Sequence, residues 1–256
     1  MGSIAMSSAT PAELGALFRS AAHVVFLTGA GISTDSGIPD FRSAAGLYTT
    51  GVNENVFDLA AFQRDPRPFY RFARDFYPVV AAARPNAAHR AIADLALAGP
   101  WRVTVVTQNV DTLHQDTGSP AAVHPVHGSW STSHCCACGV AMETAALLPA
   151  IARGELPVHA GCCGGVYKPD ITFFGENLPA AELAAAEAAV RQADLLVIVG
   201  TSLAVYPAAA LPAVRRAGCR LAVINHDPTP LDAAARLCFH DSAGTVLGTA
   251  VAAALA

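Results

Sequence analysis

A chain of 256 residues is large for one domain and small for two equal ones, so its length predicts one main domain with an insertion. Hydrophobic residues make up 53% of the sequence and charged residues 14%, which excludes a disordered chain and supports a large core. The net charge of −4, without a basic cluster or an apolar run of the ~20 residues that cross a bilayer, argues against a nucleic-acid-binding or membrane-spanning protein.

The first ten residues contain neither a positively charged segment nor a long apolar one, so we expect no signal peptide and a cytoplasmic location. In a reducing compartment the seven cysteines are expected to be metal ligands or buried thiols rather than disulfides. Lys168 is the only lysine among the 16 lysine and arginine residues, which together with the many alanines indicates a GC-rich bacterial gene.

Helical and strand patterns alternate along most of the chain. Strands are predicted at residues 23–27, 103–107, 195–199 and 221–224. Helices are predicted at residues 12–20, after a Thr10 cap, and at 60–83, 87–97, 180–193, 207–217 and 243–256. Aromatic residues at helical spacing in 60–83, a segment that prolines interrupt, are expected to pack in the core. The alternation is typical of an α/β fold with a Rossmann-like parallel sheet and helices on both faces.

The stretch 28–43, TGAGISTDSGIPDFRS, begins where the first predicted strand ends. Gly29 and Gly31 would let backbone N–H groups approach a ligand, and a helix beginning near Ser33 would point its positive end at a phosphate. Thr34 replaces the third glycine of the dinucleotide fingerprint, so a tight turn needed only for packing is an alternative. Residues 44–58 have no period, and we expect a mobile loop there.

Polar residues also follow the other predicted strands, at the sheet edge where open α/β folds bind ligands. Gln108, Asn109 and Asp111 directly follow the second strand; they can hydrogen-bond an uncharged group such as a carboxamide, or cap the next helix. The Gly-Thr-Ser segment at 200–202 and Asn225 end two later strands and suit ribose or phosphate contacts. These positions predict a nucleotide site shared by several loops.

His127 lies between this predicted edge and a cysteine-rich segment. A lone histidine is most often structural, but this position favours a general base. His114 and His124 are expected to be structural or exposed instead.

The alternation stops between residues 131 and 168, where cysteines gather. Cys135 and Cys138 have the C-x-x-C spacing that lets two thiolates reach one zinc ion, and a second pair is needed one short module later. We expect the fourth ligand to be Cys162, because a further thiolate binds zinc more strongly, or His159, which is sterically easier. Cys136 and His134 are remote alternatives. The predicted ligands of this structural zinc site are Cys135, Cys138, Cys162 and Cys163. Reduced, buried thiols without a metal are the alternative.

Together these motifs resemble the sirtuin family of NAD-dependent protein lysine deacylases, in its bacterial type. The matching segments are GAGISTDSGIPDFRS (29–43), TQNVDTLH (107–114), HGS (127–129), the cysteine module, KPDITFFGENL (168–178), GTSLAVYP (200–207) and Asn225. The resemblance implies a Rossmann-like NAD-binding domain at residues 1–130 and 169–256, with a cofactor loop at about 44–58, and a zinc-binding module at 131–168.

The resemblance also implies roles for individual residues. His127 would be the general base, with Asn109 as a second catalytic residue. NAD would contact Gly29, Ala30, Gly31, Thr34, Asp40, Phe41, Arg42, Gln108, Asn109, Val110, Asp111, Gly200, Thr201, Ser202 and Asn225. The substrate peptide would add as a strand beside Phe174, Gly175, Glu176, Asn177 and Val205. The implied reaction transfers the acyl group of lysine to ADP-ribose and releases nicotinamide, while zinc holds the module in place.

One departure bears on the acyl group. Relatives that prefer succinyl or malonyl lysine carry a Tyr-x-x-Arg pair; here Tyr70 is present, Ala73 stands in the arginine position and Arg74 comes one residue late. We therefore expect deacetylation with tolerance for other apolar acyl groups. The alternatives are a sirtuin-like protein ADP-ribosyltransferase and a non-catalytic NAD- and zinc-binding module. We expect a monomer that acts on acyl-lysine proteins and binds neither nucleic acid nor membranes.

Overall fold

A six-stranded parallel sheet forms the centre of the larger lobe in the computed structural model, which describes residues 9–256. In spatial order its strands are β3 (Ala122–Pro125), β2 (Arg102–Thr107), β1 (His23–Thr28), β7 (Leu195–Val199), β8 (Arg220–Ile224) and β9 (Leu237–Phe239). β1 and β7 are buried at every residue. Because both faces of the sheet are covered, the two strands are almost continuously apolar rather than alternating.

The strands are aligned so that their C-terminal ends meet at one edge of the sheet. Thr28 at the end of β1 pairs with Thr107 of β2 and with Val199 of β7. This register places the segments that follow the three strands side by side, where an open α/β sheet binds ligands.

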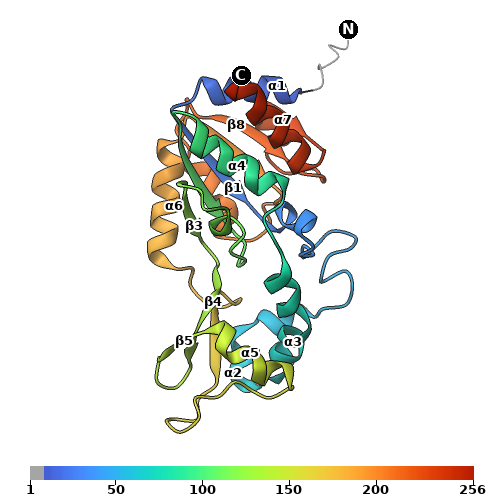
Figure 1. Ribbon diagram of the computed structural model, residues 1–256, viewed down its shortest axis with the longest axis vertical. Coiled ribbons are helices and arrows are strands. Elements are labelled where there is room, and N and C mark those ends of the chain that lie inside the picture. The colour runs from blue at the N-terminus through green and yellow to red at the C-terminus, as the bar shows by residue number, and fades with distance from the viewer. Residues whose placement is uncertain (1–8) are drawn as a thin grey trace.

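Helices cover both faces of this sheet (Figure 1). Val24 and Phe26 of β1 share a core with α1 (Pro11–Arg19), α4 (Ala87–Ala98) and α7 (Ala243–Leu255). Val25 and Leu27 point to the other face and pack with α6 (Ala180–Gln192). This division follows from the two-residue period of a strand. The prediction of a Rossmann-like sheet with helices on both faces is confirmed.

A smaller lobe, in the lower half of Figure 1, contains an antiparallel sheet and three helices. They are β5 (Ala141–Glu143), β4 (Gly128–Cys135), β6 (Tyr167–Ile171), α2 (Leu59–Arg64), α3 (Arg67–Ala82) and α5 (Thr144–Ala152). Phe62 and Phe69 pack in its core with Trp130, Tyr167 and Phe173. Phe62 and Phe69, predicted to be core, are therefore core of the smaller lobe rather than of the main sheet, whereas Phe72 and Phe76 of the same predicted stripe are half-buried.

The sequence predictions fail for short helices and edge strands. Residues 207–217 form a 3-10 helix, Ala208–Val214, because Pro212 has no N–H to donate within an α-helix. The helix expected near Ser33 is replaced by two 3-10 turns, Ala30–Ile32 and Thr34–Ser36. β3 and β9 were not predicted, because strands of four and three residues are too short to show a period.

The longer elements agree with their sequence signals. Thr10 caps α1, since its hydroxyl accepts from Glu13 N while the Glu13 carboxylate accepts from Thr10 N.

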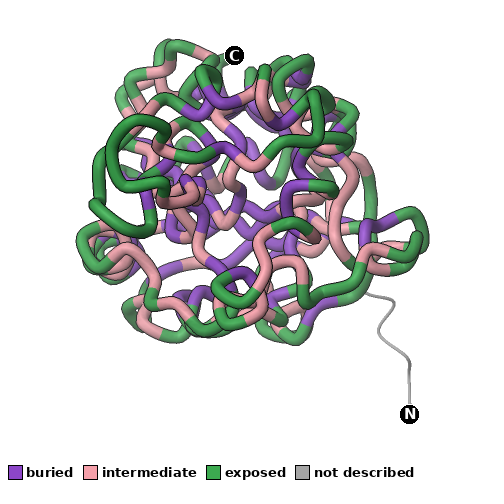
Figure 2. The backbone as a smooth tube through the Cα atoms, turned by 90° about the horizontal axis from the view of Figure 1, so that it is seen from below, coloured by how far each residue is buried: buried purple, intermediate pink, exposed green. Residues whose placement is uncertain are grey.

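Figure 2 shows the buried segments at the centre of the molecule and the exposed ones around its rim. The remaining 3-10 turns are Glu54–Phe57, Gln115–Thr117 and Asp232–Ala234. Within residues 9–256, every helix is too short or too polar to span a bilayer.

Candidate active site

A cleft of about 590 Å³ lies at the C-terminal edge of the parallel sheet. It is lined by the segments after β1, β2, β7 and β8, by His127, and by residues 171–176 after β6. The cleft is within the size range that binds cofactors and small ligands. Among the predicted catalytic, cofactor and substrate residues, all of which the structure describes, Asn177 is the one that does not line it.

The glycines after β1 and β7 allow two loops to touch. Gly31 N donates to Gly200 O at 2.9 Å, and a Cβ on Gly31 would lie 2.8 Å from Gly200 Cα. Gly200 has φ of 61°, and a Cβ there would lie 2.3 Å from Ile32 N. Side chains at either position would separate the loops. The glycines are therefore needed for close packing of the two loops. Because the same loops line the cleft, the glycine turn also fits the ligand-binding role predicted for it.

A buried serine joins the glycine loop to the segment after β2. Ser33 Oγ donates to Asp111 Oδ2 at 2.9 Å and accepts from Asn109 Nδ2 at 3.1 Å. Asp111 Oδ1 also accepts from Leu113 N at 3.0 Å. Burial raises the pKa of Asp111, against the effect of these donors. Asn109 and Asp111 are thus held in one orientation at the floor of the cleft.

Sequence reasoning missed two positioning residues, Ser33 and Asn86. Ser33 appeared only as a helix start, and no local signal indicates partners 76 and 78 residues away. Asn86 caps α4 and donates through Nδ2 to Ile32 O at 2.7 Å, which fixes the glycine loop from behind. An asparagine before an alanine-rich helix predicts the cap but not this second bond.

His127 presents one ring nitrogen to the cleft. Its Nδ1 lies 2.9 Å from Gln108 O, and because a carbonyl oxygen only accepts, Nδ1 carries the proton. The neutral ring then has its lone pair at Nε2. Burial lowers the pKa of His127, against the raising effect of the bond to Gln108. The ring is therefore neutral at pH 7 and able to accept a proton.

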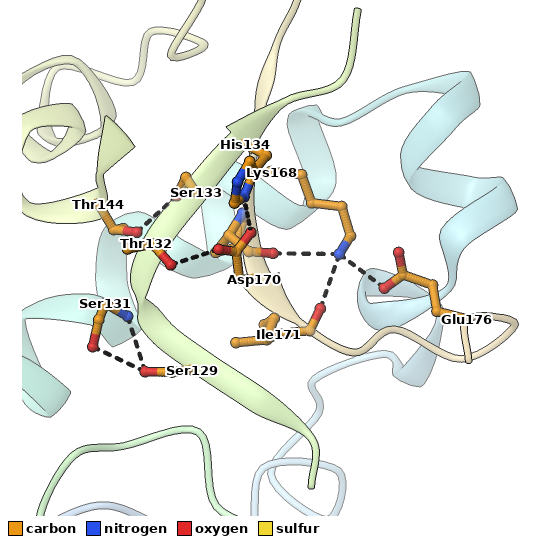
Figure 3. A network of polar contacts seen from close by, with 11 residues as sticks. Ser129, Ser131, Thr132, Ser133, His134, Thr144, Lys168, Asp170, Ile171 and Glu176 are labelled. Carbon is orange, nitrogen blue, oxygen red and sulfur yellow. Dashed lines mark hydrogen bonds and ion pairs between the residues drawn. The ribbon is translucent and has the colours of Figure 1, made fainter. Parts of the chain in front are cut away.

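The segment after β6 forms the other wall of the cleft. Lys168 Nζ donates to Ile171 O at 2.9 Å and lies 2.8 Å from Glu176 Oε2 (Figure 3). Glu176 Oε2 also accepts from Phe173 N at 2.7 Å. The Glu176 carboxylate is thus engaged within its own segment. Phe174, in contrast, is 43% exposed.

The residues that bear on acyl specificity lie outside this cleft. Tyr70 is buried, and its hydroxyl donates to Tyr167 O. Ala73 is buried in the core of the smaller lobe, and Arg74 is exposed and paired with Asp75. The apolar lining includes Val110, Trp130 and Phe173 instead.

His114 and His124 have structural surroundings. His114 is buried, with Nε2 at 3.1 Å from Thr28 Oγ1 and its ring against His89. His124 Nδ1 lies 2.9 Å from Glu182 on α6. Neither lines the cleft.

The cysteine module brings four ligand-type atoms together. Those of Cys135, Cys138, His159 and Cys163 all lie within 4.8 Å of one another, with Cys138 Sγ at 3.2 Å from His159 Nδ1. Cys162, chosen from the sequence as the fourth ligand, is exposed and does not belong to this group; the histidine alternative does. Adjacent cysteines leave a tight turn in different directions, so one can face the group while the other faces solvent. Three thiols and one imidazole are a donor set that fits a closed zinc site.

The loop at 44–58 has its own local structure. Leu47 N donates to Asp40 O at 2.8 Å and Tyr48 N donates to Phe41 O at 3.0 Å. These bonds connect the loop to Asp40 and Phe41, which precede it in the chain and line the cleft. Its mobility without a ligand stays a prediction.

Comparisons with known proteins agree along most of the chain. The Sir2 family model matches residues 29–207. An NAD-dependent protein deacetylase of Cutibacterium acnes is 41% identical over 244 residues, which cover 93% of this chain and 96% of that protein. An NAD-dependent protein deacetylase of Thermotoga maritima is 40% identical over 214 residues, 83% of this chain and 85% of that one.

Solved structures show the same fold. One described as a structural basis for the mechanism and regulation of Sir2 enzymes has a TM-score of 0.88 and 36% identity, and the match covers 95% of this chain and 97% of that one. A Sir2 structure with a p53 peptide and NAD+ has a TM-score of 0.83 and 36% identity, over 92% and 94% of the two chains. With a family model over more than half of its length and relatives at about 40% identity over most of it, the chain belongs to the Sir2 family.

Proposed function

We propose that this chain is an NAD-dependent protein lysine deacetylase, which transfers the acyl group of an acyl-lysine peptide to ADP-ribose and releases nicotinamide. Two of its relatives are named NAD-dependent protein deacetylases. A structural neighbour at 36% identity contains a deacetylated peptide with 3'-O-acetyl-ADP-ribose, and another contains a propionylated peptide. The observation that carries the proposal is His127, which lines the cleft between the glycine loops and residues 173–176 with Nε2 available.

Different residues around the cleft have different roles in NAD binding and in proton transfer. The backbone after β1 and β7, with Asn225, holds the adenosine and phosphate part of NAD. Asp111 and the Val110 backbone bind the carboxamide, at a position that Ser33 keeps rigid. Bound NAD supplies an electrophilic ribose carbon with nicotinamide as the leaving group. His127 takes a proton at Nε2 from a ribose hydroxyl, and Gln108 O keeps its ring in the required tautomer.

The peptide lies between the segment after β6 and the segment after β7. Phe174, Gly175 and Glu176 line one side of the cleft and Val205 the other. An extended peptide that pairs with backbone groups on both sides is recognised mainly through its main chain, which leaves the acyl-lysine to enter the cleft. Because these two segments can pair with an extended main chain, we propose that the substrate is an acyl-lysine peptide rather than a free amino acid.

The cysteine module, residues 131–168, is proposed to carry a structural zinc ion on Cys135, Cys138, His159 and Cys163. Four protein ligands close the coordination sphere, so the metal takes no part in the reaction. We also propose that the protein is a cytoplasmic monomer and that it does not bind nucleic acid. The net charge of −4 supports the last of these points.

An acetyl-peptide assay with and without NAD, read by mass spectrometry and by nicotinamide release, tests the function. We expect NAD-dependent loss of the acetyl group, and a decrease of about 10²-fold or more in His127→Ala. His124→Ala is the matched control, because His124 pairs with Glu182 away from the cleft. Gain of an ADP-ribose mass would instead indicate a transferase, and nicotinamide release equal to that of an NAD-free control would indicate a binding module.

A further inference from the structure

A second group of ligand-type side chains lies at the far edge of the parallel sheet from β3. Asp232 lies in the 3-10 turn Asp232–Ala234, Cys238 in the edge strand β9, and His240 directly after that strand. One ligand atom of each lies within 4.8 Å of the other two. This group belongs to the larger lobe and is separate from the cysteine module in the smaller one.

The distances between these atoms match those of a tetrahedral metal site. Zinc binds sulfur at about 2.3 Å and nitrogen or oxygen at about 2.1 Å, so tetrahedral ligands lie about 3.6 Å apart for sulfur to nitrogen and about 3.4 Å for nitrogen to oxygen. Cys238 Sγ lies 3.6 Å from His240 Nε2, and Asp232 Oδ2 lies 3.4 Å from the same nitrogen. The nitrogen-to-oxygen distance is long for a hydrogen bond, whereas the sulfur-to-nitrogen distance is within the range of one, and both suit two ligands of one ion.

Two of the three ligands, His240 and Asp232, are also oriented by further bonds. His240 Nδ1 lies 2.8 Å from Asn225 O, so Nδ1 carries the proton and Nε2 presents its lone pair to the group. The Asp232 carboxylate accepts from Thr229 N at 3.0 Å and from Thr229 Oγ1 at 2.5 Å. Metal-binding histidines and carboxylates are typically held by outer bonds of this kind.

From this arrangement we propose that Asp232, Cys238 and His240 form a second metal site, for a thiophilic divalent cation of the zinc class. A thiolate, an imidazole and one carboxylate favour such a cation over magnesium or calcium, which prefer oxygen ligands. Three protein ligands leave a fourth position for water. The side chain of His240 is 45% exposed and that of Asp232 21%, so an ion can enter from solvent.

The site is expected to bind its ion more weakly than the cysteine module, because it has one thiolate instead of three and is open. Its occupancy would tie β9 to the turn at Asp232 and hold the bond between His240 and Asn225 O, behind the cofactor cleft. The inference does not depend on the proposed deacetylase activity, since its test measures metal binding.

Cobalt(II) provides the probe, because a thiolate bound to cobalt gives a charge-transfer absorption band. Purified protein, with its resident metal measured first, is titrated with cobalt chloride. We expect about one further cobalt per chain with this band. Cys238→Ser should abolish that band, and His240→Gln and Asp232→Asn should weaken binding by about 10-fold or more.

Two controls assign the signal. Cys219→Ser removes a thiol outside both groups and should leave the further cobalt unchanged. In unmutated protein, zinc should slow alkylation of Cys238 by about 10-fold or more, read by mass spectrometry, which needs no variant to fold. Failure to bind further cobalt, equal binding by Cys238→Ser, or alkylation unaffected by zinc would each overturn the proposal.

Discussion

Lys168 and Glu176 form an ion pair that joins β6 to the segment after it, which forms a wall of the cleft. The two groups lie 2.8 Å apart, and the Lys168 side chain is only 13% exposed. The ammonium also lies 4.2 Å from the centre of the Phe173 ring. The only lysine of the chain is therefore occupied by three kinds of contact beside the proposed acyl-lysine site.

Lys168→Met should weaken peptide binding and lower the free energy of unfolding. The substitution removes the cation from the Glu176 carboxylate, which keeps only the bond from Phe173 N, and removes the side-chain donor to Ile171 O. Such a loss costs about 3–5 kcal/mol in a fully buried pair and less here, about 2 kcal/mol, because the pair is partly exposed. Urea unfolding and steady-state kinetics measure both effects. We expect the peptide KM to rise more than the NAD KM, and Lys168→Arg to recover part of the loss. An unchanged peptide KM in a folded Lys168→Met protein would contradict this role.

The pH dependence of kcat/KM should report the general base. Burial lowers the pKa of His127 below its ordinary value of 6.5, so the neutral, active form predominates at pH 7. Activity should decrease only as pH falls through this lowered pKa. Initial rates across the acidic range give the midpoint, which we expect below 6.5. A midpoint above that value would argue against a buried neutral His127.

The buried pair His89 and His114 should make the fold sensitive to acid. Burial lowers the pKa of His89 to about 4 and that of His114 to about 3. As pH falls below the ordinary value of 6.5, the unfolded chain binds protons that the folded chain does not, so stability is present above that pH and is lost as pH decreases. Each histidine contributes a slope of about 1.4 kcal/mol per pH unit. Urea unfolding at several pH values should show a smaller slope in His114→Gln; an equal slope would refute the assignment.

Metal content distinguishes the two candidates for the fourth ligand of the cysteine module. His159→Ala should lose zinc during dialysis against a chelator, because its Nδ1 belongs to the four-atom group. Cys162→Ala is the matched control variant. It removes an exposed thiol that does not belong to the four-atom group, so the protein should keep its zinc. Elemental analysis of both proteins decides between them, and the reverse result would restore the thiolate set predicted from the sequence.

Acyl preference should follow the apolar lining of the cleft. Tyr70, Ala73 and Arg74 do not line it, whereas Val110, Trp130 and Phe173 do. A neutral acetyl or butyryl group loses little on burial there, but a succinyl carboxylate would lose its hydration. Arg42, the arginine that lines the cleft, is proposed to contact NAD instead. We expect kcat/KM for a succinyl peptide to be lower than for the matched acetyl peptide by about 10-fold or more. Faster turnover of the succinyl peptide would show that another cation serves the carboxylate.

Most strands of the parallel sheet, and the loops that line the cleft, could be predicted from the amino-acid sequence. Buried strands with continuous apolar residues alternate with longer helical periods, and polar motifs follow the strand ends at 28–43, 107–111 and 200–202. A parallel sheet brings strand ends of this kind to one edge, so local patterns were sufficient to predict a shared nucleotide site. The short strands β3 and β9 were missed because they show no period, and β4, α5 and β6 were missed because the alternation stops at the cysteine-rich segment.

Contacts between side chains that are distant in the sequence could not be predicted and became visible only in the folded protein. Ser33 bonds Asp111 and Asn109 across more than 70 residues, and the choice of His159 over Cys162 depends on which way each side chain leaves a tight turn. The packing of α3 in the smaller lobe also depends on neighbours rather than on period. Periodicity describes which face of an element is apolar, but directions of bonds between distant residues are set when the elements pack.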